Sequence, residues 1–172
     1  MILIGIGSNL PGPHGESPRV MALAAVVALG GIAGLRLAAV SRFWETAPVL
    51  PAGQPAIDQP RYVNAVARLE HVAASRETDP AWLLARLQAI EAAAGRRRGA
   101  RNAARPLDLD ILDIDGRVRP APDPVLPHPR LAGRAFVLRP LAEVAPGWRH
   151  PLTGQTIATL LAGVTAQDAA PL

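Results

Sequence analysis

Short apolar segments alternate along this chain with stretches rich in glycine and proline. Residues 2–7 are an apolar run that ends in Gly-Ser-Asn, which is typical of a buried strand that leads into a loop. Pro18 suits the first turn of a helix, and residues 19–29 are almost entirely Ala, Val and Leu. Because two glycines follow at 30–31, we predict a helix that ends there.

The next two segments alternate with the period of β-strands. In residues 35–46 one face carries Leu35, Leu37, Ala39, Ser41 and Phe43. In residues 62–72 one face carries Tyr62, Asn64, Val66 and Arg68, and the other carries Val63, Ala65, Ala67 and Leu69. We predict one strand for each segment, with the two strands paired antiparallel. Residues 47–60 between them contain four prolines and a glycine, which predicts a long loop.

A second helix and a further strand follow. The Asp-Pro pair at 79–80 has the sequence of a helix N-cap and first turn, and apolar residues then recur at helical spacing until Gly95. Residues 107–113 are predicted to form a strand. The Asp-Gly pair at 115–116 should turn that strand into a short partner strand at residues 117–119.

The resulting order of strand, helix, strand, strand, helix and strand predicts a ferredoxin-like βαββαβ core. We therefore expect an α/β fold of the α+β type, with a mainly antiparallel sheet and three αβα layers. Additional C-terminal elements are a turn at residues 126–129, an apolar segment at 136–141 and a short helix at 156–161. A chain of 172 residues without internal repeats fits a single domain, residues 1–172.

The most apolar segment of the chain does not predict a membrane protein. Residues 20–35 are shorter than the roughly 20 apolar residues that span a bilayer, and they contain three glycines. We interpret them as a buried helix followed by a turn. The first residues lack the basic region of a signal peptide, so we expect a cytoplasmic protein.

Charge and residue types restrict the chemistry that is open to the chain. All 18 basic residues are arginine, so phosphate contacts must come from arginine and not from lysine. The formal net charge of +4 suits an anionic ligand such as a nucleotide, but it is equally ordinary for a protein of this size. Because cysteine is absent and the four histidines are scattered, any bound metal should have oxygen ligands.

The pattern with the most chemical content is Asp108-Leu109-Asp110, in the strand predicted at residues 107–113. Alternate residues of a strand lie on one face, so the two carboxylates should lie about 7 Å apart on the same side. Such a pair can bind Mg²⁺ while phosphates and water complete its coordination, and a solvated edge strand is the alternative. Arginines suited to a transferring phosphoryl group lie nearby in the sequence, at Arg96, Arg97, Arg98, Arg101 and Arg105.

Two further groups combine polar and aromatic side chains. His128 and Arg134 can donate hydrogen bonds to phosphate oxygens, and Phe136 offers a ring for stacking on a planar heterocycle. Tyr62 and Asn64 would present an aromatic face and an amide on one side of a strand. The alternatives are a surface turn around His128 and ordinary core packing of the two aromatic rings.

Taken together, these motifs resemble the 6-hydroxymethyl-7,8-dihydropterin pyrophosphokinase family nearly from end to end. The resemblance rests on the order of the motifs as well as on their content. They are Gly-Ser-Asn-Leu at 7–10, Ser-x-x-Trp-Glu-Thr-x-Pro at 41–48, Tyr-Val-Asn-Ala at 62–65, Gln-x-x-Glu at 88–91, Gly-Arg-x-Arg at 95–98, Arg-Pro-Leu-Asp-Leu-Asp at 105–110, Pro-His-Pro at 127–129 and Arg-x-Phe-Val-Leu-x-Pro-Leu at 134–141.

The resemblance implies transfer of pyrophosphate from ATP to 6-hydroxymethyl-7,8-dihydropterin, which gives the pterin diphosphate and AMP in tetrahydrofolate biosynthesis. By this resemblance, Asp108 and Asp110 are ligands of a pair of Mg²⁺ ions. They form the catalytic group together with Arg96 and Arg105. The residues implied in ATP binding are Gln88, Glu91, Arg96, Arg98, Arg105, His128 and Arg134.

For the pterin, the resemblance implies stacking between two rings and hydrogen bonds to the polar edges. The implied residues are Thr46, Pro48, Val49, Tyr62, Asn64 and Phe136. Stacking combined with edge recognition distinguishes the substrate from other heterocycles. The chain departs from the family pattern in the long 47–60 loop and at Leu50, Asn102, Asp123 and Val125.

Two other interpretations predict different functions. A basic ferredoxin-like module that binds RNA would carry several aromatic residues on its strands, whereas this chain has three Trp, two Phe and one Tyr. An inactive relative that only binds a partner is disfavoured by the retained Asp108, Asp110, Arg96 and Arg105. We expect ATP and the pterin as binding partners, no nucleic acid or membrane, and a monomer or weak dimer.

Overall fold

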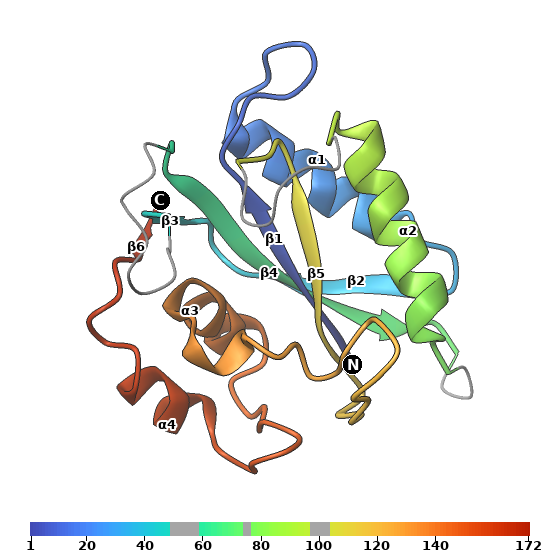
Figure 1. Cartoon of the computed structure of the whole chain (residues 1–172). Coiled ribbons are helices and arrows are strands. Elements are labelled where there is room, and N and C mark those ends of the chain that lie inside the picture. Colours follow the sequence, from blue (N-terminus) through green and yellow to red (C-terminus); the bar gives the residue numbers. More distant parts are fainter. Residues whose placement is uncertain (49–58, 74–76, 97–103) are drawn as a thin grey trace.

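The computed structural model describes residues 1–48, 59–73, 77–96 and 104–172. An open β-sheet runs through this part of the chain and carries helices on both faces (Figure 1). Its strands are β1 (Ile2–Ser8), β2 (Leu35–Val40), β3 (Trp44–Thr46), β4 (Tyr62–His71), β5 (Asp108–Ile114) and β6 (Ala170–Pro171). The helices are α1 (Pro18–Gly30), α2 (Pro80–Ala93), α3 (Ala135–Val144) and α4 (Ile157–Ala162), with a 3-10 turn at Leu131–Gly133.

The sheet is built from antiparallel pairs. Its strands follow the order β5-β1-β4-β3-β6, and β2 pairs with β4. Residues 62–64 of β4 pair with β3, and residues 67–71 pair with β2. All of the strand pairings in the described part of the chain are antiparallel. The predicted mixed α/β fold with a mainly antiparallel sheet is therefore confirmed.

One apolar core lies between the sheet and helices α1 and α2. Ile2, Ile4 and Ile6 of β1 point into it and are at most 3 % exposed. Leu83 and Leu87 of α2 complete it from the other side. Burying an aliphatic side chain of this size stabilises the fold by about 1.5–3 kcal/mol. The three isoleucines at alternate positions therefore determine which face of β1 packs against the helices.

The ends of α2 follow the predicted signals. The Asp79 carboxylate accepts hydrogen bonds from the backbone N–H groups of Ala81 and Trp82, which would otherwise lack helical partners. At the other end Gly95 has a φ of +82°, a left-handed conformation that glycine adopts without strain. Both predicted ends of this helix are confirmed.

Helix α1 is only partly buried, contrary to the predicted buried helix. Met21, Ala22, Ala25 and Leu29 form its buried side. Val20 and Leu23 are each 47 % exposed, and Val27 is 76 % exposed. The sheet offers one face to this helix, so a helix that is apolar all round leaves one side uncovered. Among the described residues, no helix is long and apolar enough to cross a membrane.

A second apolar core covers the opposite face of the sheet. Leu3, Val66 and Leu112 point into it from β1, β4 and β5. Helix α3 packs against them with its buried side, and α4 lies against α3 (Figure 1). The predicted apolar segment at residues 136–141 is thus the middle of a helix.

The single strand predicted for residues 35–46 is wrong, because the chain forms β2 and β3 separately. The register of β2 against β4 shifts between Leu37 and Ala39. At Ser41 the side-chain Oγ accepts a hydrogen bond from the N–H of Val66 at 3.0 Å, and the Ser41 N–H donates to the Val66 carbonyl. A side chain that bonds the neighbouring backbone in this way replaces a regular strand pairing.

The C-terminal third contains pairings that the hydrophobic pattern did not predict. Residues 117–119 do not return along β5 as a partner strand. Instead, Arg119 forms an isolated bridge with Leu126. The last residues of the chain form β6, which extends the sheet beside β3. A two-residue strand is too short to have a detectable alternation.

A buried carboxylate lies where β5 ends against the second core. Asp113 is fully buried, and its Oδ2 accepts hydrogen bonds from Trp148 Nε1 at 3.0 Å and from the Gly116 N–H at 3.3 Å. Within the described residues its Oδ1 has no hydrogen-bond partner. Burial raises the pKa of Asp113, because the charged form loses solvation there.

We expect Asp113→Asn to stabilise the fold at neutral pH by about 1 kcal/mol, because it removes a buried charge with an unpaired oxygen. The raised pKa means that the folded state binds this proton more tightly, so ionisation of Asp113 lowers stability as pH rises above its ordinary value. The advantage of the variant should therefore grow as the pH rises above about 4, the ordinary pKa of an aspartate, in denaturant unfolding. A constant difference across this range would contradict the assignment.

Candidate active site

A cavity of about 300 Å³ opens on the α3 face of the sheet. It lies over β1, β4 and β5, with β3 on one side and the start of α3 on the other. Ten of the residues predicted for the site line it, namely Thr46, Pro48, Tyr62, Asn64, Arg96, Arg105, Asp108, Asp110, Arg134 and Phe136. Segments that are far apart in the sequence are therefore brought together around one cavity.

The two predicted carboxylates lie on one face of β5, opposite glycines of β1. Asp108 pairs with Gly7, and Asp110 pairs with Gly5. A Cβ at Gly5 would lie 3.3 Å from the Leu112 side chain, and one at Gly7 would lie 3.4 Å from Asn64 Oδ1. Both glycines line the cavity, so the absence of side chains leaves the floor beside the carboxylates open. Neither glycine was among the predicted site residues.

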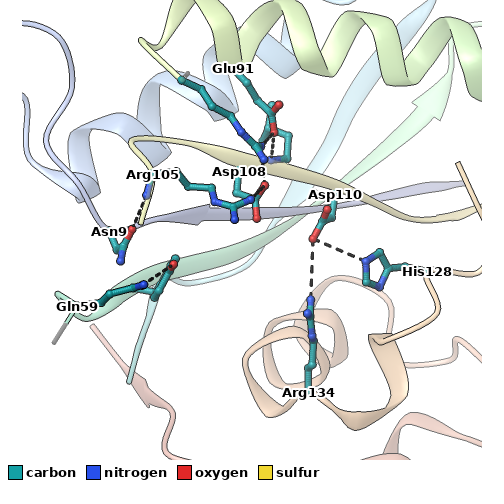
Figure 2. A network of polar contacts seen from close by, with 11 residues as sticks. Asn9, Gln59, Glu91, Arg105, Asp108, Asp110, His128 and Arg134 are labelled. Atoms are coloured by element: carbon teal, nitrogen blue, oxygen red, sulfur yellow. Dashed lines mark hydrogen bonds and ion pairs between the residues drawn. The ribbon is translucent and has the colours of Figure 1, made fainter. Parts of the chain in front are cut away.

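Asp108 is held by two arginines from different segments. Its Oδ1 lies 2.6 Å from Arg96 Nη1 and 3.0 Å from Arg105 Nη1. Arg96 also pairs with Glu91, whose Oε1 accepts a hydrogen bond from the Leu109 N–H at 2.7 Å (Figure 2). Glu91 thus links the end of α2 to β5, directly between the two site carboxylates.

Glu91 lies behind the cavity and not on its surface. Its side chain is 9 % exposed, and burial raises the pKa of Glu91. The Leu109 N–H and the Arg96 guanidinium act in the opposite direction by stabilising the carboxylate. The structure therefore gives Glu91 a positioning contact with Arg96 and β5, alongside the ATP-binding role that the resemblance implied.

Asp110 faces two cationic or polar groups at longer distances. Its Oδ2 lies 3.9 Å from His128 Nε2 and 4.0 Å from Arg134 Nη1 (Figure 2). Burial, together with the neighbouring Asp108 carboxylate, raises the pKa of Asp110 to about 6, although Arg134 opposes this rise. Two ionised carboxylates therefore repel each other in this cavity, where burial limits their solvation.

His128 is neutral and has a defined tautomer. Burial and the neighbouring Arg134 and Arg130 lower the pKa of His128 to about 4. Its Nδ1 accepts a hydrogen bond from the Arg130 N–H at 3.2 Å, so the ring proton of the neutral imidazole is on Nε2. The N–H that faces Asp110 is therefore available as a donor without adding a positive charge.

Aromatic and polar side chains form the other part of the cavity. Tyr62 and Phe136 both line it, one from β4 and the other from the first turn of α3. Asn64 Nδ2 donates to Thr46 Oγ1 at 2.8 Å, and both residues are at most 5 % exposed. The guanidinium of Arg134 lies 5.3 Å from the centre of the Phe136 ring. Flat apolar surface and fixed hydrogen-bonding groups thus occur side by side.

Five of the fifteen predicted residues are not among those that line the cavity, and two of them, Glu91 and His128, lie beside it as described above. Gln88 is exposed on α2 and does not line it. Val49 and Arg98 lie outside the described residues, as do Leu50 and Asn102, at which the chain departs from the family pattern. Gln59 and Arg130 line the cavity, although neither was among the predicted site residues. The sequence signal for Arg130 was its place directly after Pro-His-Pro.

The Gly-Ser-Asn-Leu motif holds the segment that precedes the carboxylates. The Asn9 Oδ1 accepts a hydrogen bond from the Arg105 N–H at 2.9 Å, and the Arg105 carbonyl accepts one from the Asn9 N–H (Figure 2). The other end of the Asn9 amide donates to the Pro60 carbonyl at 3.2 Å. Ser8 Oγ donates to the Pro106 carbonyl at 2.6 Å. The sequence showed an Asn after the predicted strand, but neither its burial nor its partner.

Two carboxylates surrounded by arginines, next to two rings and a buried amide, define a site of the phosphate-transferring enzymes. Comparison with known proteins specifies the family. Residues 3–146 match the family described as 7,8-dihydro-6-hydroxymethylpterin-pyrophosphokinase. The chain belongs to this family.

Individual relatives agree with this assignment. The chain is 40 % identical over 161 residues to the 2-amino-4-hydroxy-6-hydroxymethyldihydropteridine pyrophosphokinase of Pseudomonas aeruginosa, covering 94 % of this chain and 90 % of the relative. The protein of the same name from Haemophilus influenzae is 37 % identical over 142 residues, which are 83 % of this chain and 79 % of the relative. The mitochondrial folate synthesis bifunctional protein of Arabidopsis thaliana is 37 % identical over 144 residues, but these are only 23 % of its length.

We expect Asn9→Ala to slow turnover between about tenfold and a hundredfold, because Arg105 loses the contact that fixes its backbone. The variant should also lose about 1–3 kcal/mol of stability, since a buried N–H and a carbonyl lose their partners. Steady-state kinetics and denaturant unfolding measure the two effects. Thr78→Val is the matched control, because Thr78 is also buried but bonds His71, outside the cavity. Equal kinetic losses in both variants would contradict the positioning role of Asn9.

Proposed function

We propose that this protein transfers the pyrophosphate group of ATP to 6-hydroxymethyl-7,8-dihydropterin, giving the pterin diphosphate and AMP. The observation that carries the proposal is that Asp108 and Asp110 share one cavity with arginines, two aromatic rings and a buried amide. Arg96 and Arg105 contact Asp108, and Arg134 approaches Asp110. Tyr62, Phe136 and Asn64 line the same cavity. A phosphate donor and a flat acceptor can therefore meet at the carboxylates.

The carboxylates suit a magnesium ion more than a metal with nitrogen or sulfur ligands. Among the described residues, no group of three or more His, Cys, Asp or Glu side chains could hold an ion. Mg²⁺ commonly binds one or two carboxylates and takes its other ligands from substrate phosphates and water. We infer that Asp108 and Asp110 would hold a pair of Mg²⁺ ions when ATP is bound. The ions would supply charge neutralisation and acidify the acceptor hydroxyl.

The ATP phosphates are assigned to the arginines that surround the carboxylates. Arg96 and Arg105 already converge on Asp108, and Arg134 approaches Asp110. Arginine forks bind phosphate oxygens and stabilise the charge that spreads over a transferring group. His128 would add an uncharged N–H donor. We further assign Gln88, Glu91 and Arg98 to the ATP site by the family resemblance.

The pterin is assigned to the two rings and the buried amide. Tyr62 and Phe136 would stack on its two faces, and Asn64 with Thr46 would recognise its polar edges. Pro48 would border it together with Val49. Because the Asn64 amide is already oriented by Thr46, its remaining oxygen is fixed before the substrate arrives. This preorganisation favours a heterocycle with donor groups at that edge.

These residues accomplish transfer mainly by position and charge. The attacking hydroxyl and the phosphorus must be brought in line, and the cavity walls exclude the competing water. Arg96 and Arg105 stabilise the developing charge from one side, and Arg134 does so from the other. No covalent intermediate on the protein is required, because the acceptor hydroxyl can attack the β-phosphorus directly while the bond to AMP breaks.

The finer description of the fold and setting is also a proposal. The strand order and the two helical faces support a ferredoxin-like βαββαβ core in a three-layer αβα arrangement, with the C-terminal elements added. We infer one domain spanning residues 1–172, a cytoplasmic location and a monomer or weak dimer. The acidic centre of the cavity supports a small-molecule ligand over nucleic acid.

An assay with Mg-ATP and 6-hydroxymethyl-7,8-dihydropterin tests the proposed reaction. Chromatography should show AMP and the pterin diphosphate in equal amounts, because attack at the β-phosphorus releases AMP. ADP would instead identify a simple kinase. Absence of turnover would contradict the proposed function and favour an inactive relative.

Asp110→Ala should reduce turnover by at least about a thousandfold while leaving the protein folded, because it removes a ligand of the catalytic ions. Steady-state rates and thermal unfolding measure these two properties. Removal of magnesium with a chelator should have the same effect on the wild type. Asp123→Ala, at an exposed aspartate outside the cavity, is the control and should keep full activity. Undiminished turnover in Asp110→Ala would refute the metal assignment.

A further inference from the structure

The C-terminal segment returns from α4 to the edge of the sheet beside the cavity. Its last residues form β6, in which Ala170 and Pro171 pair with Glu45 and Trp44 of β3. The Leu172 N–H donates to the Phe43 carbonyl at 2.8 Å. Figure 1 shows this segment running from α4 past the start of α3 to β3. It lies beyond residue 146, where the match to the family ends.

Gln167 in this segment caps the first turn of α3. Its Oε1 accepts a hydrogen bond from the Ala135 N–H at 2.9 Å, and its Nε2 donates to the Gly133 carbonyl at 2.8 Å. The residue at the N-cap position, Arg134, makes no side-chain capping bond. The first N–H groups of a helix need partners from outside the helix, and Gln167 supplies one from 32 residues away. Gln167 therefore restrains the turn that carries Phe136.

Asp168, the next residue, holds the opposite wall. Its Oδ2 accepts a hydrogen bond from the Ala47 N–H at 3.2 Å and lies 2.8 Å from Arg61 Nη2. Arg61 also donates to Glu45 at 2.8 Å, on β3. Ala47 directly follows Thr46, and Arg61 directly precedes Tyr62. Asp168 thus restrains both segments that form the Thr46 and Tyr62 side of the cavity.

We propose that Gln167 and Asp168 are positioning residues that set the distance between the two walls of the pterin site. The proposal rests on the proposed function, which assigns the pterin to the space between Tyr62 and Phe136. The two residues are adjacent in the chain, so their side chains connect the start of α3 to β3 and β4 over a single peptide unit. Neither residue lines the cavity itself.

The distance between the walls matters because the contact energy of stacked rings falls steeply as their separation increases. Carbon atoms in contact lie about 3.5–4.0 Å apart, and a gap of 0.5–1 Å forfeits roughly a quarter to a half of the contact energy. A slot for one ring must satisfy this condition on both faces at once. Releasing either wall should therefore weaken pterin binding more than ATP binding, since Arg96 and Arg105 are held by Asp108 and Asn9 instead.

The main test replaces Asp168, because its hydrogen bond to Ala47 and its ion pair with Arg61 both lie on the Thr46 and Tyr62 wall. Asp168→Ala should raise KM and Kd for the pterin about tenfold while KM for ATP stays within about twofold of wild type. Asp168→Asn retains an acceptor for the Ala47 N–H but loses the charge opposite Arg61, so it should recover part of the affinity. Steady-state kinetics with each substrate varied and titration calorimetry with the pterin measure the effects.

Gln167→Leu tests the other wall with nearly the same side-chain volume. It should weaken pterin binding to a similar extent. ATP binding should also weaken, but less, because Arg134 adjoins the same turn. The combined Gln167→Leu and Asp168→Ala protein should lose less than the product of the single effects, because both residues restrain one distance. Thr165→Ala, at an exposed residue of the same segment, is the matched control and should leave both affinities unchanged.

The outcomes separate this inference from the proposed function. Wild-type protein that neither turns over nor binds the pterin overturns the proposed function and this inference with it. Wild-type turnover with unchanged pterin KM in Asp168→Ala overturns the inference alone. Parallel losses for pterin and ATP, accompanied by a lower Tm in both Asp168 variants, would assign the segment a purely structural role and also overturn it.

Discussion

The placement of two carboxylates on one face of β5 is the constraint on which the rest of the site depends. Asp108 and Asp110 lie opposite two glycines of β1, so no side chain of β1 separates them from the cavity and their charge faces it. Such a concentration of charge requires cations, and the protein provides them from separate segments. Arg96 follows α2, Arg105 precedes β5, and Arg134 precedes α3. The packing of α2 and α3 against the sheet brings these arginines together.

The residual imbalance of charge suits the reaction. Asp110 has a raised pKa because the nearby arginines do not fully offset its burial and its neighbour Asp108. A site that is fully neutralised by its own side chains would gain little from binding magnesium and phosphates. In the proposed complex, Mg²⁺ bound with ATP would supply the positive charge that the protein lacks, so binding energy would be reserved for the catalytic complex.

The second half of the site depends on elements of a different kind. The carboxylates are held by β5 within the sheet, whereas the rings come from β4 and from the first turn of α3. The position of α3 follows from the second apolar core, from the Gln167 cap and from the C-terminal strand beside β3. Site geometry in this protein is therefore shared between a sheet that is buried on both faces and a C-terminal segment attached at its edge. The family match covers the first of these, and the contacts of Gln167 and Asp168 identify the second.

Much of this protein was determined by sequence alone, because local chemistry sets it. The alternation in residues 62–72, the Asp-Pro helix start at 79–80 and the two carboxylates of β5 each depend on periods and caps that neighbouring residues specify. The order of motifs likewise identified the family. Only tertiary structure decided that residues 35–46 break at Ser41, that Asn9 holds Arg105, and that Gln167 caps α3. These features depend on hydrogen bonds between residues that are distant in the chain. The periodicity of the sequence does not predict which partner a polar side chain will have.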